Sequence, residues 1–126
     1  STNIQLIPEL SHEDVWKHMQ GATVGIIASI DTPRTRVDTP TKLFEFMAAG
    51  CGIISSDLPP IRHHVSKSIQ WSCPGSAQSI AEGLIKLLQN HRFLENQARQ
   101  NRRLILNQYN WESISNKLIT LYKRLL

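Results

Sequence analysis

Short apolar runs alternate with amphipathic segments along the first two thirds of the chain. The runs are rich in aliphatic and β-branched residues, which is typical of buried strands. They span Ile4–Ile7, Ala22–Ser29, Gly52–Ser56 and Ile69–Ser72. Helices are predicted between them, over Ser11–Gln20, over Pro40–Gly50 and, as a short turn, over Ile61–Val65. Continuous apolar strands separated by helices indicate an α/β fold with a parallel sheet covered on both faces.

The last third of the chain is predicted to be helical. Apolar side chains recur at helical spacing over Ser79–Gln89 and Trp111–Leu126, and a more polar helix is expected over Arg92–Gln108. Asn110 suits the N-cap of the final helix. The chain lacks the strand, glycine-rich turn and helix that normally open a doubly wound domain, so we expect it to be a piece of a larger protein.

The helix predicted over Pro40–Gly50 has both ends marked. Thr39 suits the N-cap, Pro40 the first helical position, and Gly50 the left-handed position that closes a helix. Nearly every residue between them is apolar, so the helix is expected to be buried on most sides. Glu45 lies in its middle, and a buried carboxylate is costly unless a partner stabilises it. The partner of Glu45 is therefore a direct clue to function.

Composition narrows the class of protein. The chain has 126 residues, of which 40% are hydrophobic and 19% charged, as expected for one domain with a packed core. Cys51 and Cys73 are predicted to be free, buried thiols, because this composition needs no disulfide. The His and Cys residues have no metal-site spacing. The longest apolar run, Ala22–Ile30, is too short to cross a membrane.

The net charge of +4 is unevenly distributed. Residues 86–126 carry eight Lys or Arg and two Asp or Glu, whereas residues 1–85 carry six and eight. A solvated helical face explains this basic excess, and contact with an anionic surface such as lipid headgroups is the alternative. Nucleic-acid binding through Arg99, Arg102 and Arg103 is disfavoured, because no base-stacking aromatic residue lies among them.

The start of the Pro40–Gly50 helix is a candidate anion site. Ligands of open parallel sheets bind beyond the carboxyl ends of the strands, where the loop Asp31–Thr39 is expected to lie. The free N–H groups and the dipole at a helix N-terminus attract anions. Hydroxyl and cationic side chains gather there: Thr39, Thr41, Lys42, Arg34 and Arg36. This pattern favours a bound phosphate or diphosphate.

Glu45 lies one helical turn further along. A carboxylate can accept two hydroxyl hydrogen bonds at once, as the 2′,3′-diol of a ribose requires. The alternative is a local ion pair with Lys42, three residues before it. The spacing leaves both interpretations open.

Three parts of the chain carry a resemblance to a known family. They are Pro40–Gly50 with the following strand and Ser56-Asp57-Leu58-Pro59, Ser11–Val15 with Ala22–Ile26, and Tyr109-Asn110-Trp111-Glu112. Together they resemble the donor-site domain of GT-B glycosyltransferases, most closely the group 1 enzymes, also called family 4. The resemblance implies that residues 1–126 form the C-terminal donor-binding domain: a partial Rossmann-like parallel sheet followed by C-terminal helices. The first strands and the whole N-terminal domain would be absent.

The resemblance also implies roles for individual residues. Glu45 matches the second glutamate of the family's E-x7-E motif, which usually holds the donor ribose. Thr39, Thr41 and Lys42 match the helix tip near the diphosphate, and the backbone at Leu10 matches the loop that meets the base. Selectivity for the donor sugar would lie partly in the loop that carries Arg34, Arg36 and Asp38.

Two positions depart from the family pattern. Val37 stands where the first motif glutamate is expected, and Gly52 replaces the usual proline. The catalytic and acceptor-binding residues would lie in the N-terminal domain, so this chain alone is not expected to catalyse transfer. The alternative is a non-catalytic binding or docking module, a pseudoenzyme that uses the basic C-terminal helices.

The activity implied by the resemblance is glycosyl transfer, of a hexose and with retention, from a nucleotide-diphosphate sugar. The acceptor would be a glycan or a lipid-linked saccharide in polysaccharide biosynthesis. No metal or other cofactor is expected, and no nucleic acid is expected as a partner. The implied location is cytoplasmic, with peripheral contact at the inner membrane face.

The remaining distinctive side chains are given structural roles. His63 and His64 are predicted to be surface or loop groups. The tryptophans are predicted to be packing anchors and the methionines to lie in the core: Trp16, Trp71, Trp111, Met19 and Met47.

Overall fold

A computed structural model describes residues 3–65 and 67–126. Its centre is a parallel sheet with strand order β1-β2-β3, formed by β1 (Val24–Ile27), β2 (Gly52–Ser56) and β3 (Gln70–Ser72). Six helices surround or extend this sheet: α1 (His12–Gly21), α2 (Thr41–Ala49), α3 (Pro59–Val65), α4 (Ala77–Gln89), α5 (His91–Asn107) and α6 (Trp111–Leu125). The predicted α/β architecture with a parallel sheet is confirmed.

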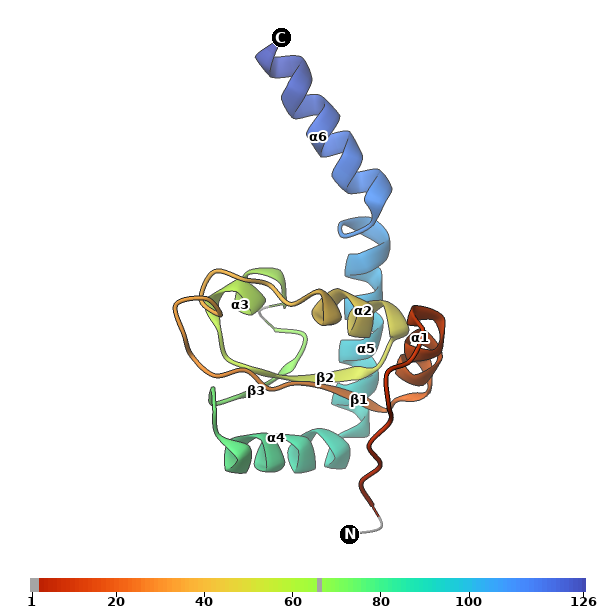
Figure 1. The fold of residues 1–126 in the computed structure, drawn as a ribbon, viewed down its shortest axis with the longest axis vertical. Coiled ribbons are helices and arrows are strands. Elements are labelled where there is room, and N and C mark those ends of the chain that lie inside the picture. The colour runs from red at the N-terminus through yellow and green to blue at the C-terminus, as the bar shows by residue number, and fades with distance from the viewer. Residues whose placement is uncertain (1–2, 66) are drawn as a thin grey trace.

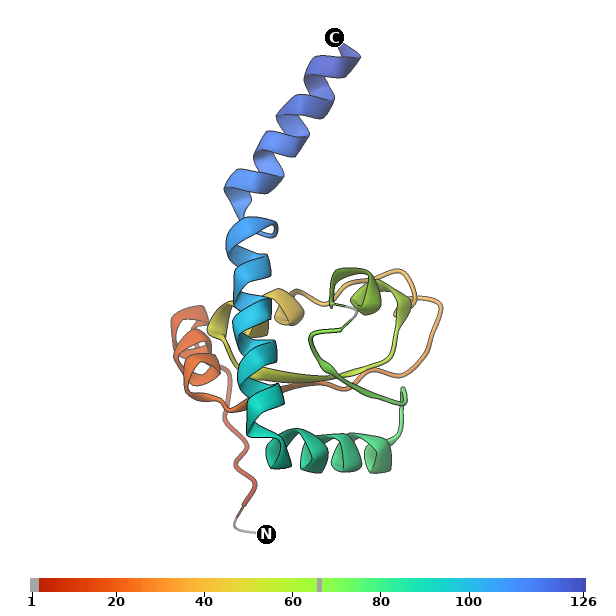
Figure 2. The same cartoon turned by 180° about the vertical axis from the view of Figure 1, so that it is seen from behind.

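The helices cover both faces of the sheet (Figures 1 and 2). Helices α2 and α3 lie on one face and α4 on the other, while α5 runs past the sheet from the level of α4 to that of α2. The central strand β2 is buried along its whole length because it has a strand on each side and helices on both faces. The core contains Ile53 of β2 together with Leu43 and Met47 of α2.

Two glycines, which have no side chain, allow α2 and α4 to pack closely against the sheet. A Cβ at Gly25 of β1 would lie 2.5 Å from Cγ of Phe46 in α2, and one at Gly83 of α4 would lie 2.6 Å from Cδ1 of Ile54. The space that a Cβ would need is therefore filled by a neighbouring side chain at both positions. Each face of the sheet depends on a glycine for its helix to approach this closely.

Two buried amides of α5 complete the sheet. The Ile53 N–H donates to Oε1 of Gln97 at 2.6 Å, and Nδ2 of Asn101 donates to the Ser68 carbonyl at 2.9 Å. The Gly52 N–H donates to the Thr23 carbonyl, on the side of β1. Because successive N–H groups of a strand point in opposite directions, the Ile53 N–H points toward the side of β3. The β2–β3 pairing begins only at Ile54, and Gln97 therefore supplies the acceptor that β3 does not.

Most predicted helix ends are confirmed. Ser11 caps α1 by accepting from the Asp14 N–H at 3.2 Å, and Asn110 caps α6 by accepting from the Ser113 N–H at 2.8 Å. Gly50 closes α2 with φ of 74°, in the left-handed region as predicted.

The strand predicted over Ile4–Ile7 is wrong. This segment has no regular structure, and Leu6 is 93% exposed. Residues 3–10 lead away from the sheet toward the N-terminus (Figure 1), so they have no neighbouring strand to bond with. A strand depends on such a neighbour for its backbone hydrogen bonds.

Three burial predictions are also wrong. Met19, predicted to lie in the core, is only half-buried, and α1 has no buried residue. Trp111 is 85% exposed, because α6 leaves the body of the molecule at this residue (Figure 1). Cys73 is exposed, because it lies beyond the end of β3, although both cysteines are free thiols as predicted and Cys51 is buried. Met47 lies in the core as predicted, and the Trp71 ring is half-buried beneath the Arg62 guanidinium, 4.6 Å from its centre.

Candidate functional site

The candidate site lies at the carboxyl ends of β1 and β2. Ser56 joins these two ends: its Oγ accepts from the Ser29 N–H at 2.9 Å and donates to the Ser29 carbonyl at 2.8 Å. A hollow of about 110 Å³ lies beside this link, lined by residues that include Ser29, Thr35, Asp38 and Pro40. The loop that follows β1 and the start of α2 therefore meet where parallel sheets usually bind ligands.

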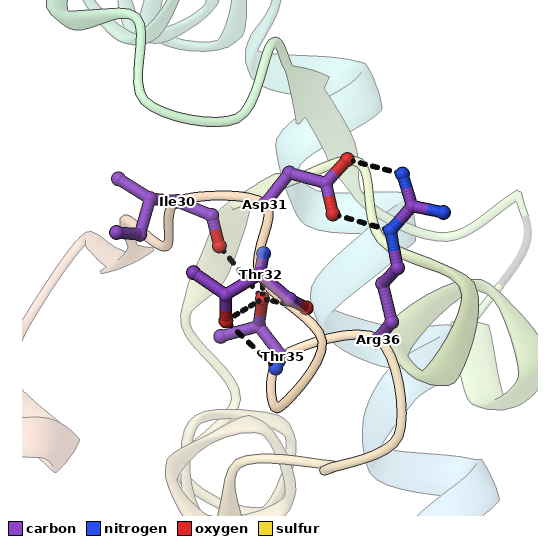
Figure 3. Close-up of polar contacts among 5 residues, drawn as sticks. All are labelled: Ile30, Asp31, Thr32, Thr35 and Arg36. Atoms are coloured by element: carbon purple, nitrogen blue, oxygen red, sulfur yellow. Dashed lines mark hydrogen bonds and ion pairs between the residues drawn. The ribbon is translucent and has the colours of Figure 1, made fainter.

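A network of hydrogen bonds organises the loop after β1 (Figure 3). Thr35 Oγ1 donates to the Ile30 carbonyl at 2.7 Å and accepts from the Thr32 N–H at 2.9 Å. Arg36 forms two parallel hydrogen bonds with Asp31, at 2.7 and 2.8 Å. These bonds lower the pKa of Asp31 and raise that of Arg36. The Arg36 charge is therefore already compensated within the loop.

The other two cations of the site are more available. Arg34 is 88% exposed and its Nε lies 3.9 Å from Asp38 Oδ2, a weak surface pair. Lys42 is exposed and has no carboxylate partner among residues 3–65 and 67–126. Positive charge at the α2 tip thus comes chiefly from Lys42 and Arg34.

Thr39 is not the N-cap of α2, contrary to the prediction. Pro40 occupies the cap position with an extended backbone, and no side chain caps the helix. Thr39 Oγ1 lies instead 3.5 Å from Nε2 of His64 in α3. The helix begins at Thr41, and its first backbone bond runs from the Leu43 N–H to the Pro40 carbonyl. The N–H groups of Thr41 and Lys42 precede this bond, so they are available to an anion.

Glu45 is half-buried rather than enclosed. Its side chain is 37% exposed, and Oε1 lies 3.5 Å from Nε2 of His12 at the start of α1. The His12 side chain is itself 87% exposed, so this contact leaves the carboxylate open to water and to a ligand. Among the described residues, the nearest cationic or imidazole nitrogen to the Glu45 carboxylate belongs to His12, and no Lys42–Glu45 ion pair is formed. Leu10 lies two residues before His12, on the segment that leads into α1.

His64 is a site neighbour that the sequence did not reveal. Its ring lies edge-on to Phe44 of α2 at 5.1 Å and to Tyr109 at 5.2 Å, and Nδ1 lies 3.1 Å from the Tyr109 hydroxyl. Burial lowers the pKa of His64, and the nearby His63 lowers it further. The predicted surface or loop role is therefore wrong for His64, which packs between α2 and the end of α5. Tyr109 is 45 residues away in the chain, so no local spacing could indicate this contact.

Residues 1–104 match the family described as "Glycosyl transferases group 1". The chain belongs to this family. Its fold is that of GT-B glycosyltransferases, with a Rossmann-like parallel sheet. The solved structure of sucrose-phosphate synthase from Thermosynechococcus elongatus superposes with a TM-score of 0.83 and 20% sequence identity. The match covers 98% of this group 1 chain and 30% of the synthase chain. No curated protein sequence matches significantly.

Two features are absent from the described residues: a cluster of metal-binding side chains and a membrane-spanning helix. Among residues 3–65 and 67–126, no group of three or more His, Cys, Asp or Glu side chains is arranged to hold a metal ion. No helix in the same ranges combines the length and apolar character needed to span a bilayer.

Proposed function

We propose that this chain binds the nucleotide-diphosphate sugar donor of a glycosyltransferase, as the enzyme's C-terminal donor-binding domain. The observation that carries the proposal is the geometry of α2. One helix presents uncapped N–H groups at its start and a water-accessible carboxylate, Glu45, about one turn further along. Membership of the group 1 family supports the same function.

The start of α2 would hold the diphosphate. The N–H groups of Thr41 and Lys42, the hydroxyl of Thr41 and the Lys42 ammonium are the donors at this end, and Thr39 lies just before it. Negative charge grows on the diphosphate as the bond to the sugar breaks. A helix N-terminus and a cation aimed at that charge stabilise the transition state more than the bound substrate.

Glu45 would accept hydrogen bonds from the two ribose hydroxyls. Its weak contact with the exposed His12 is readily given up, so little stabilisation is lost when a diol takes its place. The base would then lie toward α1, near the backbone at Leu10. This arrangement extends the nucleotide along α2, from the diphosphate at the tip to the base beside α1.

The loop after β1 would face the donor sugar. Arg34 and Asp38 form only a long surface pair at 3.9 Å, while Arg36 is held at 2.7 Å by Asp31 and braces the loop. We assign Arg36 to shaping the loop and Arg34 with Asp38 to contacting the sugar. Val37 occupies the first position of the glutamate motif and is 82% exposed, so an apolar side chain stands where a carboxylate is usual.

The acceptor would be bound by a second domain across a cleft. The chain spans 30% of the sucrose-phosphate synthase chain that it matches, so the activity of a whole enzyme involves more than these residues. We propose transfer of a hexose with retention to a glycan or lipid-linked saccharide, without a metal or cofactor. The setting would be polysaccharide biosynthesis at the cytoplasmic face of a membrane.

Replacement of Glu45 by alanine in the full-length protein tests the ribose assignment. The variant loses two hydrogen bonds to a charged acceptor, each worth about 1.5–3 kcal/mol. We expect at least about tenfold weaker binding of UDP-, GDP- or ADP-sugars, measured by isothermal titration calorimetry. Glu82→Ala, at an exposed glutamate of α4, is the matched control and should bind as the parent does. Equal affinities of the Glu45→Ala variant and the parent would contradict the assignment.

A non-catalytic docking module is the second candidate. The observation that favours it is α6, which carries no buried residue and has Lys123 and Arg124 in its last turn. Turnover assays with a panel of nucleotide sugars separate the two functions. Nucleotide binding with no transfer to any acceptor in the panel would favour the docking module.

A further inference from the structure

A cavity of about 410 Å³ lies between the end of α3 and the second half of α5. Lys67 and His64 contribute to its wall on the α3 side, and Gln100, Arg103 and Asn107 contribute from α5. These three α5 residues recur at intervals of three and four, so they share one face of the helix. The cavity is within the size range of small-molecule sites.

Five side chains of this cavity have no hydrogen-bond or ion-pair partner among the described residues: Lys67, Gln100, Arg103, Asn107 and Gln108. Its lining contains no carboxylate, and neither Lys67 nor Arg103 forms an ion pair within residues 3–65 and 67–126. The side-chain amides of Gln100, Asn107 and Gln108 make no hydrogen bond in the same ranges, although all three line the cavity. Arg103 and Lys67 are therefore two cations that line one concave surface without a carboxylate beside them.

We propose that this cavity binds a phosphate-bearing anion. A phosphate offers several acceptor oxygens, which suit the Arg103 guanidinium, the Lys67 ammonium and the surrounding amide N–H groups. The volume leaves room for an attached organic group beside the phosphate. The site is distinct from the start of α2, because His64 stands between them: its ring lines the cavity while its Nε2 faces Thr39. The proposal does not rest on the donor-binding function.

Inorganic phosphate is the first probe, added at constant ionic strength to ¹⁵N-labelled full-length protein. We expect saturable amide shifts at Lys67, Ser68 and the Gln100–Asn107 segment. Arg103→Gln should weaken phosphate binding at least fivefold. Arg102→Gln is the matched control, because it removes the same charge from the next residue of α5, which does not line the cavity. This control should retain the parent affinity.

Two results would overturn the proposal. One is a set of shifts confined to Thr41 and Lys42 at the start of α2, which would place the anion at the proposed donor site instead. The other is equal weakening by Arg103→Gln and Arg102→Gln, which would indicate general charge attraction. The phosphate-binding experiments do not depend on the Glu45→Ala result. If Glu45→Ala did not change nucleotide-sugar binding, the donor-site proposal would fail while the amide shifts and the effect of Arg103→Gln would still test the cavity.

Vesicles of phosphatidylcholine with one quarter phosphatidic acid separate the two sources of phosphate. If Arg103→Gln lowers both phosphate binding and co-sedimentation with these vesicles, the site takes a lipid headgroup. If it lowers phosphate binding alone, the site takes a soluble phosphorylated compound. Both results support the site, and the Arg102→Gln control applies to each.

Discussion

The His64 imidazole lies in surroundings that favour its neutral form. It is partly buried between the rings of Phe44 and Tyr109, and its pKa is lowered first by burial and then by His63. Lys67 and Arg103 also line the cavity that His64 faces. Protonating the ring would place a further positive charge among these groups.

This environment predicts that the protein loses stability as the pH falls. The folded-state pKa of His64 lies below the unfolded value of about 6.5, so the unfolded chain binds more protons in this range. The His64 contribution is fully present above about pH 6.5 and declines below it, until the folded-state pKa is also passed. Urea unfolding between pH 5 and 8 should show an unfolding free energy that rises with pH. The His64→Gln variant should show a smaller rise, and the difference should correspond to at most about one proton bound on unfolding. The same slope in both proteins would show that His64 does not titrate differently on folding.

Glu45 shows what could be predicted about a single residue and what could not. Its place in the middle of a short apolar helix follows from the end signals of that helix and is confirmed. The side chain that its carboxylate contacts, His12, is 33 positions away and becomes adjacent only because α1 packs beside α2. Local spacing suggested Lys42 because it cannot register such tertiary contacts.

At the level of elements, α5 is both a covering helix and part of the sheet's hydrogen-bonding system. Gln97 and Asn101 are one turn apart, and their amides reach the start of β2 and the residue before Ile69. Both side chains are almost fully buried. Because an unpaired backbone group in the core is costly, α5 fixes the place where the β2–β3 ladder begins.

Replacing Gln97 with methionine should therefore destabilise the protein. The Ile53 N–H loses its acceptor, which costs about 1–3 kcal/mol. A value near the lower end is expected, because Nε2 of Gln97 is itself buried without a partner among the described residues. The change in unfolding free energy is measured by urea denaturation, with the exposed Gln20→Met of α1 as control. A Gln97→Met variant as stable as the parent would mean that water or relaxation replaces this hydrogen bond.

Helix ends were more predictable than strand pairing. Ser11 and Asn110 cap helices through hydrogen bonds to residues three positions on, so the sequence contains the whole interaction. The Ile4–Ile7 segment has strand-like composition, but a strand also needs a neighbour, and none lies beside it in the described sheet. Thr39 had the chemistry of a cap, yet its hydroxyl faces His64 instead.

At the scale of the whole molecule, α6 stands apart from the α/β body. It continues beyond α5 and points away from the sheet in both views (Figures 1 and 2), and none of its residues is buried. Leu118, Leu121 and Leu125 of this helix are at least half exposed. The amphipathic pattern of α6 was predictable, but its lack of packing partners was not, because a pattern does not say what covers an apolar face.

Removing residues 111–126 should therefore leave the body of the protein folded. A single change at an exposed position typically alters stability by no more than about 0.5 kcal/mol. Because α6 has no buried residue, its removal should shift Tm by only a few degrees. Differential scanning calorimetry of the truncated and parent chains measures this directly. A drop of more than about 10 °C would show that α6 stabilises the body through contacts with it.

The contact between Gly25 and Phe46 also constrains the order in which this sequence can change during evolution. Any side chain at position 25 would overlap the Phe46 ring, whereas a smaller residue at position 46 leaves only a void against β1. Substitution of Phe46 must therefore come before substitution of Gly25, and the reverse order passes through a variant with overlapping atoms. The two positions are expected to be epistatic. The constraint is weaker at Gly83 on the opposite face of the sheet, where the only overlap is with the terminal Cδ1 of Ile54, an atom that a change of rotamer can move.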